Sequence, residues 1–343
     1  MMKQLPVIEK HKLSSGLQHA YALSIVLANP EITDWYNESY ILPIIFEFKA
    51  KSVASPGEYL DSYAYSNISA YKDIFIQHGY SERFIPQNGL INCIKEFIND
   101  GNYVVIFVDE FYLLACNMGG KNHFLHEELI YGYNDEEKIF YSLGINSDIH
   151  YGSIKHKYED LLYSYNEGII CDRHGDIDWA RENRVITIKP IKKDIEYKCD
   201  KNNIFDSIKR YLSPSLSCKE NFKLYSPAFK NIYLGLDCYK YISECVINGK
   251  DVFPLLHLMF EHKDIFTDHL IYLNADFNSQ NYYKRQITKM AEAIRMLGLK
   301  RRYVSTDKQK KDIDKNILEL IKEMELNETT FLQFLLSDKR IFS

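Results

Sequence analysis

Three segments rich in β-branched and aromatic residues follow one another in the middle of the chain, and they constrain its fold most strongly. They span residues 102–114, 126–133 and 138–145. Residues of these types favour strands, and the short polar stretch 134–137 between the last two segments suits a hairpin. We therefore predict three neighbouring strands of one sheet, to which residues 184–191 add a further strand.

Segments with helical periodicity surround these predicted strands. Apolar residues at spacings of three and four predict helices over residues 17–29, 89–99 and 153–166, and again along most of the chain after residue 200. The expected fold class is therefore α+β. We expect an α/β core over residues 1–200, with an antiparallel sheet and an N-terminal helix, followed by a helical accessory region over residues 201–343.

Composition excludes several classes of protein. The 343 residues are 46% hydrophobic and 26% charged, which is ordinary for a globular chain, and the net charge of −5 gives no sign of a nucleic-acid-binding surface. No apolar run is long enough for a membrane span, and the N-terminus lacks the apolar core of a signal peptide. The seven cysteines form no CxxC pair. We expect a cytoplasmic protein with reduced thiols, no metal, and neither a nucleic-acid nor a membrane partner.

Four residues with catalytic chemistry gather around the predicted strands. Asp109 lies in the first predicted strand, Cys116 and His123 lie in the loop that follows, and His126 opens the second strand. A carboxylate on one strand can orient a histidine on the next and fix its tautomer, as in a general-base pair. The alternative is that Asp109 caps a loop and the histidines are surface residues, and the pattern alone favours that alternative.

The stretches "VDEFYL" (108–113) and "HFLHEELIYGYNDE" (123–136) resemble the core motif of the butirosin biosynthesis protein H N-terminal family. In that motif a histidine stands six residues before a Gly-Tyr-Asp turn, and here His126 stands six residues before Gly132. Residues 251–263, "DVFPLLHLMFEHK", are similar to a helical segment of relatives encoded beside nonribosomal peptide assembly lines. The resemblance covers about residues 16–145 and 230–275.

The resemblance implies a papain-like fold and acyl transfer in specialised-metabolite biosynthesis. An acyl or peptidyl carrier protein would present the acyl group as a thioester on its phosphopantetheine, and a small amine would accept it. No other cofactor is implied. A cysteine thiolate at the start of the first long helix would take the acyl group, and His126 would deprotonate the amine.

The nucleophile of the family falls on Gly16 in this chain, and glycine cannot attack a thioester. Three explanations stay open at this point. The cysteine expected there was replaced by engineering, the chain is a natural pseudoenzyme, or the nucleophile is displaced to Ser14, Ser15 or Cys116.

The third member of the catalytic group is a second departure from the family pattern. Many papain-like enzymes orient the histidine with an Asp or Asn on the following strand, where this chain has Gly144. Asp109 is the remaining candidate for orienting His126. We predict that His19 and Cys116 contact the substrate. A half-buried helix histidine is the favoured alternative for His19, and an ordinary loop thiol explains Cys116 equally well.

The C-terminal motif and the function itself leave alternatives open. Glu261, His262 and Lys263 are predicted to make packing or capping contacts on a helix rather than to carry chemistry.

An amide-forming acyltransferase is the first hypothesis for the function of the chain. A non-catalytic protein that binds a peptide or a carrier domain is the second, and a cysteine peptidase or thioesterase on the same fold is the third.

Overall fold

The computed structural model divides into two compact units. It describes residues 1–14, 16–41, 43–48, 62–65, 74–81, 85, 89–172, 184–191, 197–214 and 229–338. Within these ranges, unit 1 comprises residues 1–33 and 74–197, and unit 2 comprises residues 34–48, 62–65 and 198–338. Residues 34–48 and 62–65, from the first half of the chain, therefore group with the C-terminal helices.

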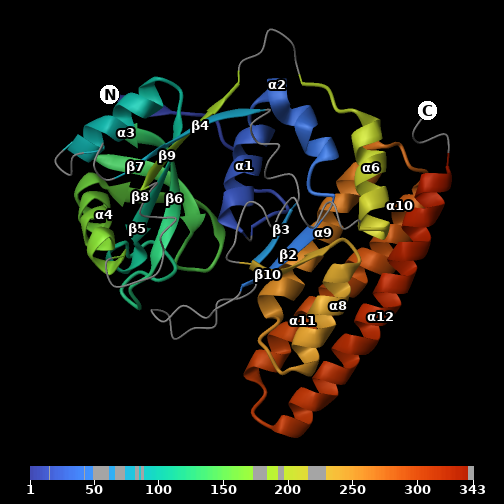
Figure 1. Ribbon diagram of the computed structural model, residues 1–343. Helices are drawn as coiled ribbons and strands as arrows, with labels where there is room; N and C mark the ends of the chain where they lie inside the picture. Colours follow the sequence, from blue (N-terminus) through green and yellow to red (C-terminus); the bar gives the residue numbers. More distant parts are fainter. Residues whose placement is uncertain are drawn as a thin grey trace. The chain divides into compact units, whose positions relative to one another are not determined.

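Unit 1 is built on a seven-stranded sheet in the order β4-β9-β5-β6-β7-β8, with β1 paired to β6 (Figure 1). All of its pairings are antiparallel. The strands are β1 (Met2–Gln4), β4 (Phe75–Tyr80), β5 (Tyr103–Asp109), β6 (Leu125–Asn134), β7 (Ile139–Ile145), β8 (Tyr151–Lys157) and β9 (Val185–Pro190). The three predicted neighbouring strands are β5, β6 and β7, and residues 184–191 supply β9, so these predictions are confirmed.

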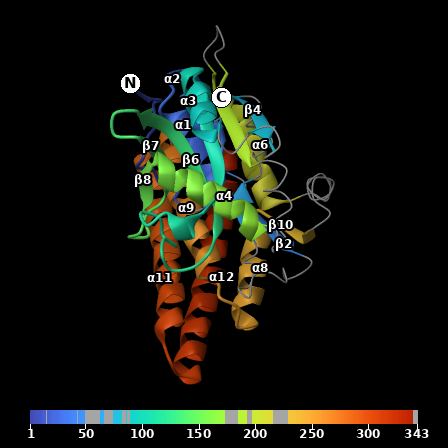
Figure 2. The same ribbon diagram turned by 90° about the vertical axis from the view of Figure 1, so that its left-hand side faces the viewer.

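Two helices cover one face of this sheet. They are α3 (Leu90–Asn99) and α4 (Tyr158–Asp172), and Figure 2 shows α4 lying across the strands. Ile94 and Ile98 of α3 and Leu161 and Tyr165 of α4 pack against buried residues of β5, among them Ile106. Complete burial of β5 explains why its sequence is apolar along its whole length rather than alternating.

The helix predicted over residues 153–166 begins later than expected. Residues 151–157 form β8, paired with β7 from Ile139↔Lys157 to Ile145↔Tyr151. Ile154 and His156 are buried while Ser153 and Lys155 are exposed, which is the alternation of a strand with one face on the core. Only after this pairing ends does the chain form α4.

The first helix, α1 (Leu17–Leu27), begins at residue 17 as predicted, ends two residues earlier than predicted, and is followed by the short α2 (Pro30–Thr33). Gly16 has φ 65°, in the left-handed region that glycine adopts without strain. The Tyr21 hydroxyl of α1 donates a hydrogen bond of 2.8 Å to the main-chain oxygen of Glu127 on β6. This contact joins α1 to the strand that begins beside His126.

Unit 2 combines helices with a small antiparallel sheet in the order β10-β2-β3. The strands are β2 (Pro43–Phe48), β3 (Ser62–Tyr65) and β10 (Phe229–Leu234). The helices are η1 (Asp34–Glu38), α6 (Lys201–Leu212), α8 (Asp237–Ile247), α9 (Phe253–Tyr272), α10 (Phe277–Tyr283), η5 (Lys284–Thr288), α11 (Lys289–Tyr303) and α12 (Asp307–Ser337). The region after residue 200 is therefore not purely helical, because β10 pairs with β2.

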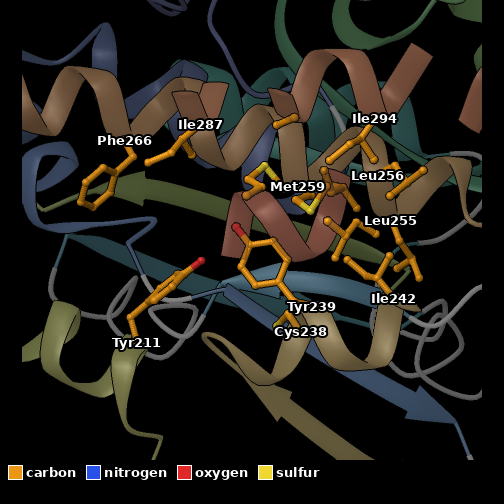
Figure 3. Packing of buried hydrophobic residues seen from close by; sticks show 14 of the residues in the cluster. Tyr211, Cys238, Tyr239, Ile242, Leu255, Leu256, Met259, Phe266, Ile287 and Ile294 are labelled. Atoms are coloured by element: carbon orange, nitrogen blue, oxygen red, sulfur yellow. The ribbon is translucent and has the colours of Figure 1, made fainter. Parts of the chain in front are cut away.

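Helix α9 forms the centre of the core of unit 2. Leu255, Leu256 and Met259 on α9 pack against Ile242 of α8 and Ile294 of α11 (Figure 3). Side chains are buried around most of the circumference of α9, as expected of a helix enclosed by other helices.

The described elements combine helices with antiparallel sheets, which confirms the α+β fold class. Among the helices that the structure describes, none is both long and apolar enough to cross a membrane.

Candidate functional site

Two carboxylate–imidazole pairs stand at the junction of β5 and β6. The first joins Asp109 and His123, with 2.7 Å between Oδ2 and Nδ1. Asp109 is fully buried, and its Oδ1 accepts hydrogen bonds from the main-chain N–H groups of Phe111 and Phe124. Burial and these hydrogen bonds hold the Asp109 carboxylate in place. The His123 side chain, by contrast, is 53% exposed, and its ring reaches solvent.

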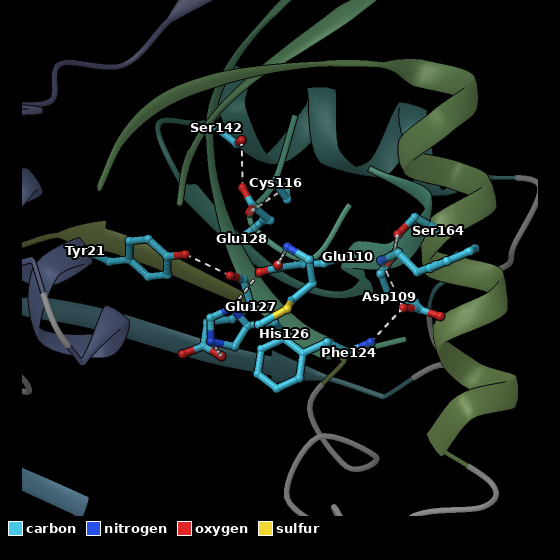
Figure 4. A network of polar contacts seen from close by, with 12 residues as sticks. Tyr21, Asp109, Glu110, Cys116, Phe124, His126, Glu127, Glu128, Ser142 and Ser164 are labelled. Atoms are coloured by element: carbon cyan, nitrogen blue, oxygen red, sulfur yellow. Dashed lines mark hydrogen bonds and ion pairs between the residues drawn. The ribbon is translucent and has the colours of Figure 1, made fainter. Parts of the chain in front are cut away.

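The second pair joins Glu110 and His126, with 2.8 Å between Oε1 and Nδ1 (Figure 4). Glu110 is buried, and its Oε2 accepts a hydrogen bond of 3.1 Å from the main-chain N–H of Met118. The hydrogen bond at Nδ1 leaves Nε2 of His126 to face Oε2 of Glu127 at 3.7 Å. This arrangement fixes the orientation of the imidazole from both of its nitrogens.

Acidic neighbours hold His126 in its protonated form. Burial by itself would lower the pKa of His126, but the carboxylates of Glu127, Glu110 and Glu128 outweigh burial and raise the pKa to about 9. His126 is thus positively charged at neutral pH, and its side chain is 24% exposed.

Aromatic rings surround both imidazoles. The ring of Phe111 stacks on His123 at 4.3 Å between centroids, and Tyr112 meets His123 edge-on at 5.6 Å. Phe124, which is 43% exposed, lies 4.8 Å from the ring of His126. Apolar rings beside charged groups form the kind of surface that binds an organic substrate and orients it.

A third carboxylate, Glu128, is buried two residues further along β6. Its Oε1 accepts a hydrogen bond from the Cys116 thiol at 3.4 Å, and its Oε2 accepts one from the Ser142 hydroxyl at 2.8 Å (Figure 4). Gly144 lies against this carboxylate, and a Cβ atom at position 144 would overlap it unless the Glu128 side chain shifted. Glycine at position 144 thus makes room for a carboxylate on the adjacent strand.

The expected pairing of Asp109 with His126 is wrong. Asp109 binds His123, and the carboxylate that orients His126 is Glu110. The chain leaves β5 at Asp109 and turns into the short helix η4 (Glu110–Tyr112), with the Asp109 side chain accepting from Phe111 N–H at its start. This turn directs the two consecutive carboxylates to different histidines.

Cys116 is not an available loop nucleophile. It is fully buried and forms an isolated bridge with Asn146, and burial together with the nearby carboxylates of Glu128 and Glu110 raises the pKa of its thiol far above the usual value. A thiol that donates to a carboxylate is the protonated, unreactive form. Cys116 also has no exposed surface with which to contact a substrate.

The structure places Gly16 at the start of α1 and buries His19 inside the protein. Gly16 caps α1, and its carbonyl accepts the first hydrogen bonds of the helix, from the N–H groups of His19 and Ala20. His19 is completely buried, and burial lowers its pKa to about 3, so its ring is neutral. His19 has no exposed surface with which to contact a substrate. Ser15, one of the alternative nucleophiles, lies outside the described residues.

Comparison with known proteins gives no family for the chain. No family model matches it, and no curated protein matches it. The site is therefore interpreted from its own geometry.

Sequence reasoning missed Glu110, Glu127 and Glu128 as site residues. Each lies next to a residue that was singled out, in "VDEF" or "HEEL", and carboxylates flanking a histidine were the available signal. Their separate roles depend on the turn at η4 and on strand alternation, neither of which the motif itself specifies.

The polar residues of "FEHK" lie in a separate cluster inside unit 2. Lys263 forms an ion pair with Glu328 at 2.8 Å, and both side chains are 1% exposed. Glu328 also accepts hydrogen bonds from the hydroxyls of Tyr211, Tyr239 and Tyr283. His262 is hydrogen-bonded through Nε2 to the main-chain oxygen of Ile41 at 2.9 Å. These are contacts of packing, in line with the role predicted for the segment.

Proposed function

We propose that the chain is a cytoplasmic acyltransferase with a papain-like core in unit 1, which forms an amide bond in specialised-metabolite biosynthesis of the nonribosomal peptide type. The acyl donor is a thioester on the phosphopantetheine of a carrier protein, and the acceptor is a small amine. The observation that carries this proposal is the hydrogen bond between His126 and the buried Glu110, which presents an oriented imidazole at the start of β6.

Glycine at position 16 makes a one-step transfer the simplest chemistry for this chain. The amine nitrogen attacks the thioester carbon, a C–N bond forms, and the C–S bond breaks. His126 gives its Nε2 proton to the departing sulfur and receives the proton that the attacking nitrogen loses, so that amide and free thiol are the products. Glu110 orients the ring throughout this exchange.

The surroundings of His126 suit both substrates. The exposed ring of Phe124 offers an apolar surface to the acyl chain or the pantetheine arm. The Glu127 carboxylate, 3.7 Å from Nε2, is placed to accept a hydrogen bond from an incoming amine. Exclusion of water from this surface would favour the amine over hydrolysis.

The test is amide formation from benzoyl-pantetheine and an alkylamine, followed by mass spectrometry, for the wild-type chain, His126→Gln and Glu110→Gln. We expect both variants to lose at least about 100-fold in rate, the usual contribution of a positioned acid–base group. His150→Gln, which changes an exposed histidine, is the matched control and should keep the wild-type rate. Equal rates in the wild type and both site variants would refute the role of the pair.

A specific observation favours a second candidate, a binding protein without catalysis. Position 16 has no side chain, and the Cys116 thiol is held protonated against Glu128. Binding of benzoyl-pantetheine by the wild-type chain with no product at any pH would favour this candidate. A thioesterase would instead release benzoic acid in the absence of an amine.

A further inference from the structure

We propose that Cys116, Glu128 and His156 bind one zinc ion within unit 1. The three residues come from the loop after β5, from β6 and from β8, and their ligand atoms lie within 4.8 Å of one another. The sequence separates them by 12 and 28 positions and contains no metal-binding template around them. The pairing of β6, β7 and β8 brings Glu128 and His156 together, and the bridge between Cys116 and Asn146 places the third residue beside them.

The distances suit a tetrahedral ion that these three residues and one water molecule would coordinate. Zinc binds thiolate sulfur at about 2.3 Å and nitrogen or oxygen at about 2.0 Å, which places neighbouring ligand atoms roughly 3.3–3.5 Å apart. Cys116 Sγ lies 3.4 Å from Oε1 of Glu128, and His156 Nε2 lies 3.5 Å from its Oε2. A small rotation of the Glu128 carboxylate would let the three ligand atoms converge on one ion.

His156 supplies the observation that points to a ligand. Its side chain is 2% exposed, and its Nε2 makes no hydrogen bond within the described part of the chain although it faces the Glu128 carboxylate. A buried ring nitrogen without a hydrogen bond costs free energy unless another partner satisfies it. A metal ion at the centre of the cluster would accept the Nε2 lone pair.

The charges of the ligand set also balance. A thiolate and a carboxylate carry two negative charges, which neutralise Zn²⁺ and leave no net charge in a buried site. All three residues are at most 3% exposed. Binding replaces the S–H proton of Cys116 by a sulfur–zinc bond, and that proton is released to solvent, so affinity should rise with pH. Thiolate, imidazole and carboxylate together favour zinc over magnesium or calcium.

Titration of the full-length, metal-stripped protein with ZnCl₂, and with CoCl₂ as a spectroscopic probe, tests this site. We expect one ion per chain, and with cobalt a sulfur-to-metal charge-transfer band together with the intense visible bands of a tetrahedral complex. Cys116→Ser and His156→Gln should each weaken zinc binding by more than about 100-fold, because even the outer partners of metal ligands contribute 10–100-fold.

The control is Cys93→Ser, which changes a partly exposed thiol of α3 and should leave affinity and spectrum unchanged. Circular dichroism shows whether Cys116→Ser and His156→Gln are folded. The effect on zinc affinity is judged from the folded variants. Absence of bound zinc in the wild-type chain, or a charge-transfer band that persists in Cys116→Ser or disappears in Cys93→Ser, would overturn the site. No substrate enters these measurements, so their outcome is independent of the proposed acyl transfer.

Discussion

The two units contain contrasting clusters of buried charge. In unit 2, Lys263 and Glu328 are completely enclosed, and the Glu328 carboxylate is surrounded by the lysine and three tyrosine hydroxyls. In unit 1, the carboxylates of Asp109 and Glu110 are equally buried, but their histidines are 53% and 24% exposed. A cluster whose members are all satisfied inside the protein serves structure, whereas one that presents a held imidazole to solvent can serve chemistry.

The largest effect is expected in unit 2. Glu328→Gln removes the charge that compensates Lys263, and breaking a buried pair costs about 3–5 kcal/mol of unfolding free energy. Denaturant unfolding measures this loss. Glu319→Gln is the matched control, because its pair with Lys315 spans 3.8 Å on an exposed helix face, and it should cost less than about 1 kcal/mol. Equal losses in the two variants would remove the contrast between enclosed and exposed pairs.

The next effect is a pH dependence of stability that originates in unit 1. Burial lowers the pKa of His19 to about 3, below the ordinary 6.5 of the unfolded chain. The unfolded state therefore takes up a proton first, so the stability contribution is complete above pH 6.5 and declines as the pH falls toward 3. Between pH 6.5 and pH 5 the loss is about 2 kcal/mol.

Unfolding curves recorded at these two pH values measure that loss. His19→Gln should remove this part of the pH dependence, whereas His150→Gln, at an exposed position, should retain it. An unchanged pH dependence in His19→Gln would show that the neutral state of His19 does not limit acid stability.

A smaller stability effect, joined to a large effect on rate, is expected at Glu110. Glutamine there has one side-chain oxygen, so it can accept a hydrogen bond from His126 or from the N–H of Met118 but not from both. Because His126 retains contact with water and with Glu127, the loss of one of these hydrogen bonds costs about 1 kcal/mol. The rate should nevertheless fall at least about 100-fold, because the charge that orients the imidazole is gone. A stability loss in Glu110→Gln as large as that in Glu328→Gln would make the pair structural.

The smallest effect is expected at the partly exposed pair of Lys95 and Asp135, which are 2.6 Å apart and 24% and 29% exposed. The hydrogen bond from Lys95 lowers the pKa of Asp135. Because water screens such pairs, Asp135→Asn should cost at most about 1 kcal/mol, and the difference from wild type should shrink at high salt. A salt-independent loss of several kcal/mol would indicate that exposure does not govern the strength of these pairs.

The amino-acid sequence predicted those parts of the fold that depend on local pattern. The apolar, β-branched run of β5 and the hairpin of β6 and β7 were correctly predicted, because strand propensity and turn composition agree with the final pairing there. Residues 151–157 were assigned in part to a helix, since Gly152 and Ser153 resemble a helix start, but pairing with β7 makes them a strand. In the region after residue 200, which was predicted to be helical, residues 229–234 likewise form a strand, because β10 pairs with β2.

The candidate site was also predictable only in part, because local sequence pattern identifies residue types but not the contacts between strands. His126 and Asp109 were found from residue type and position, but the partner of each depends on the turn at η4. Glu128 and His156 stand 28 positions apart, and their contact exists only because β6, β7 and β8 are adjacent in the sheet. Local pattern identified Asp109 and His126 but not Glu110, and only the tertiary pairing decides which of these side chains meet.

The central claim is that the wild-type chain transfers an acyl group directly to an amine at His126. Its most direct test follows benzoyl-pantetheine and an alkylamine by recording, in one reaction, the amide product and the intact mass of the protein. The account predicts that amide forms, that the mass of the wild-type chain stays unchanged, and that His126→Gln forms no amide above background. Absence of amide with the wild-type chain, or a wild-type chain that accumulates a covalently bound acyl group, would contradict it.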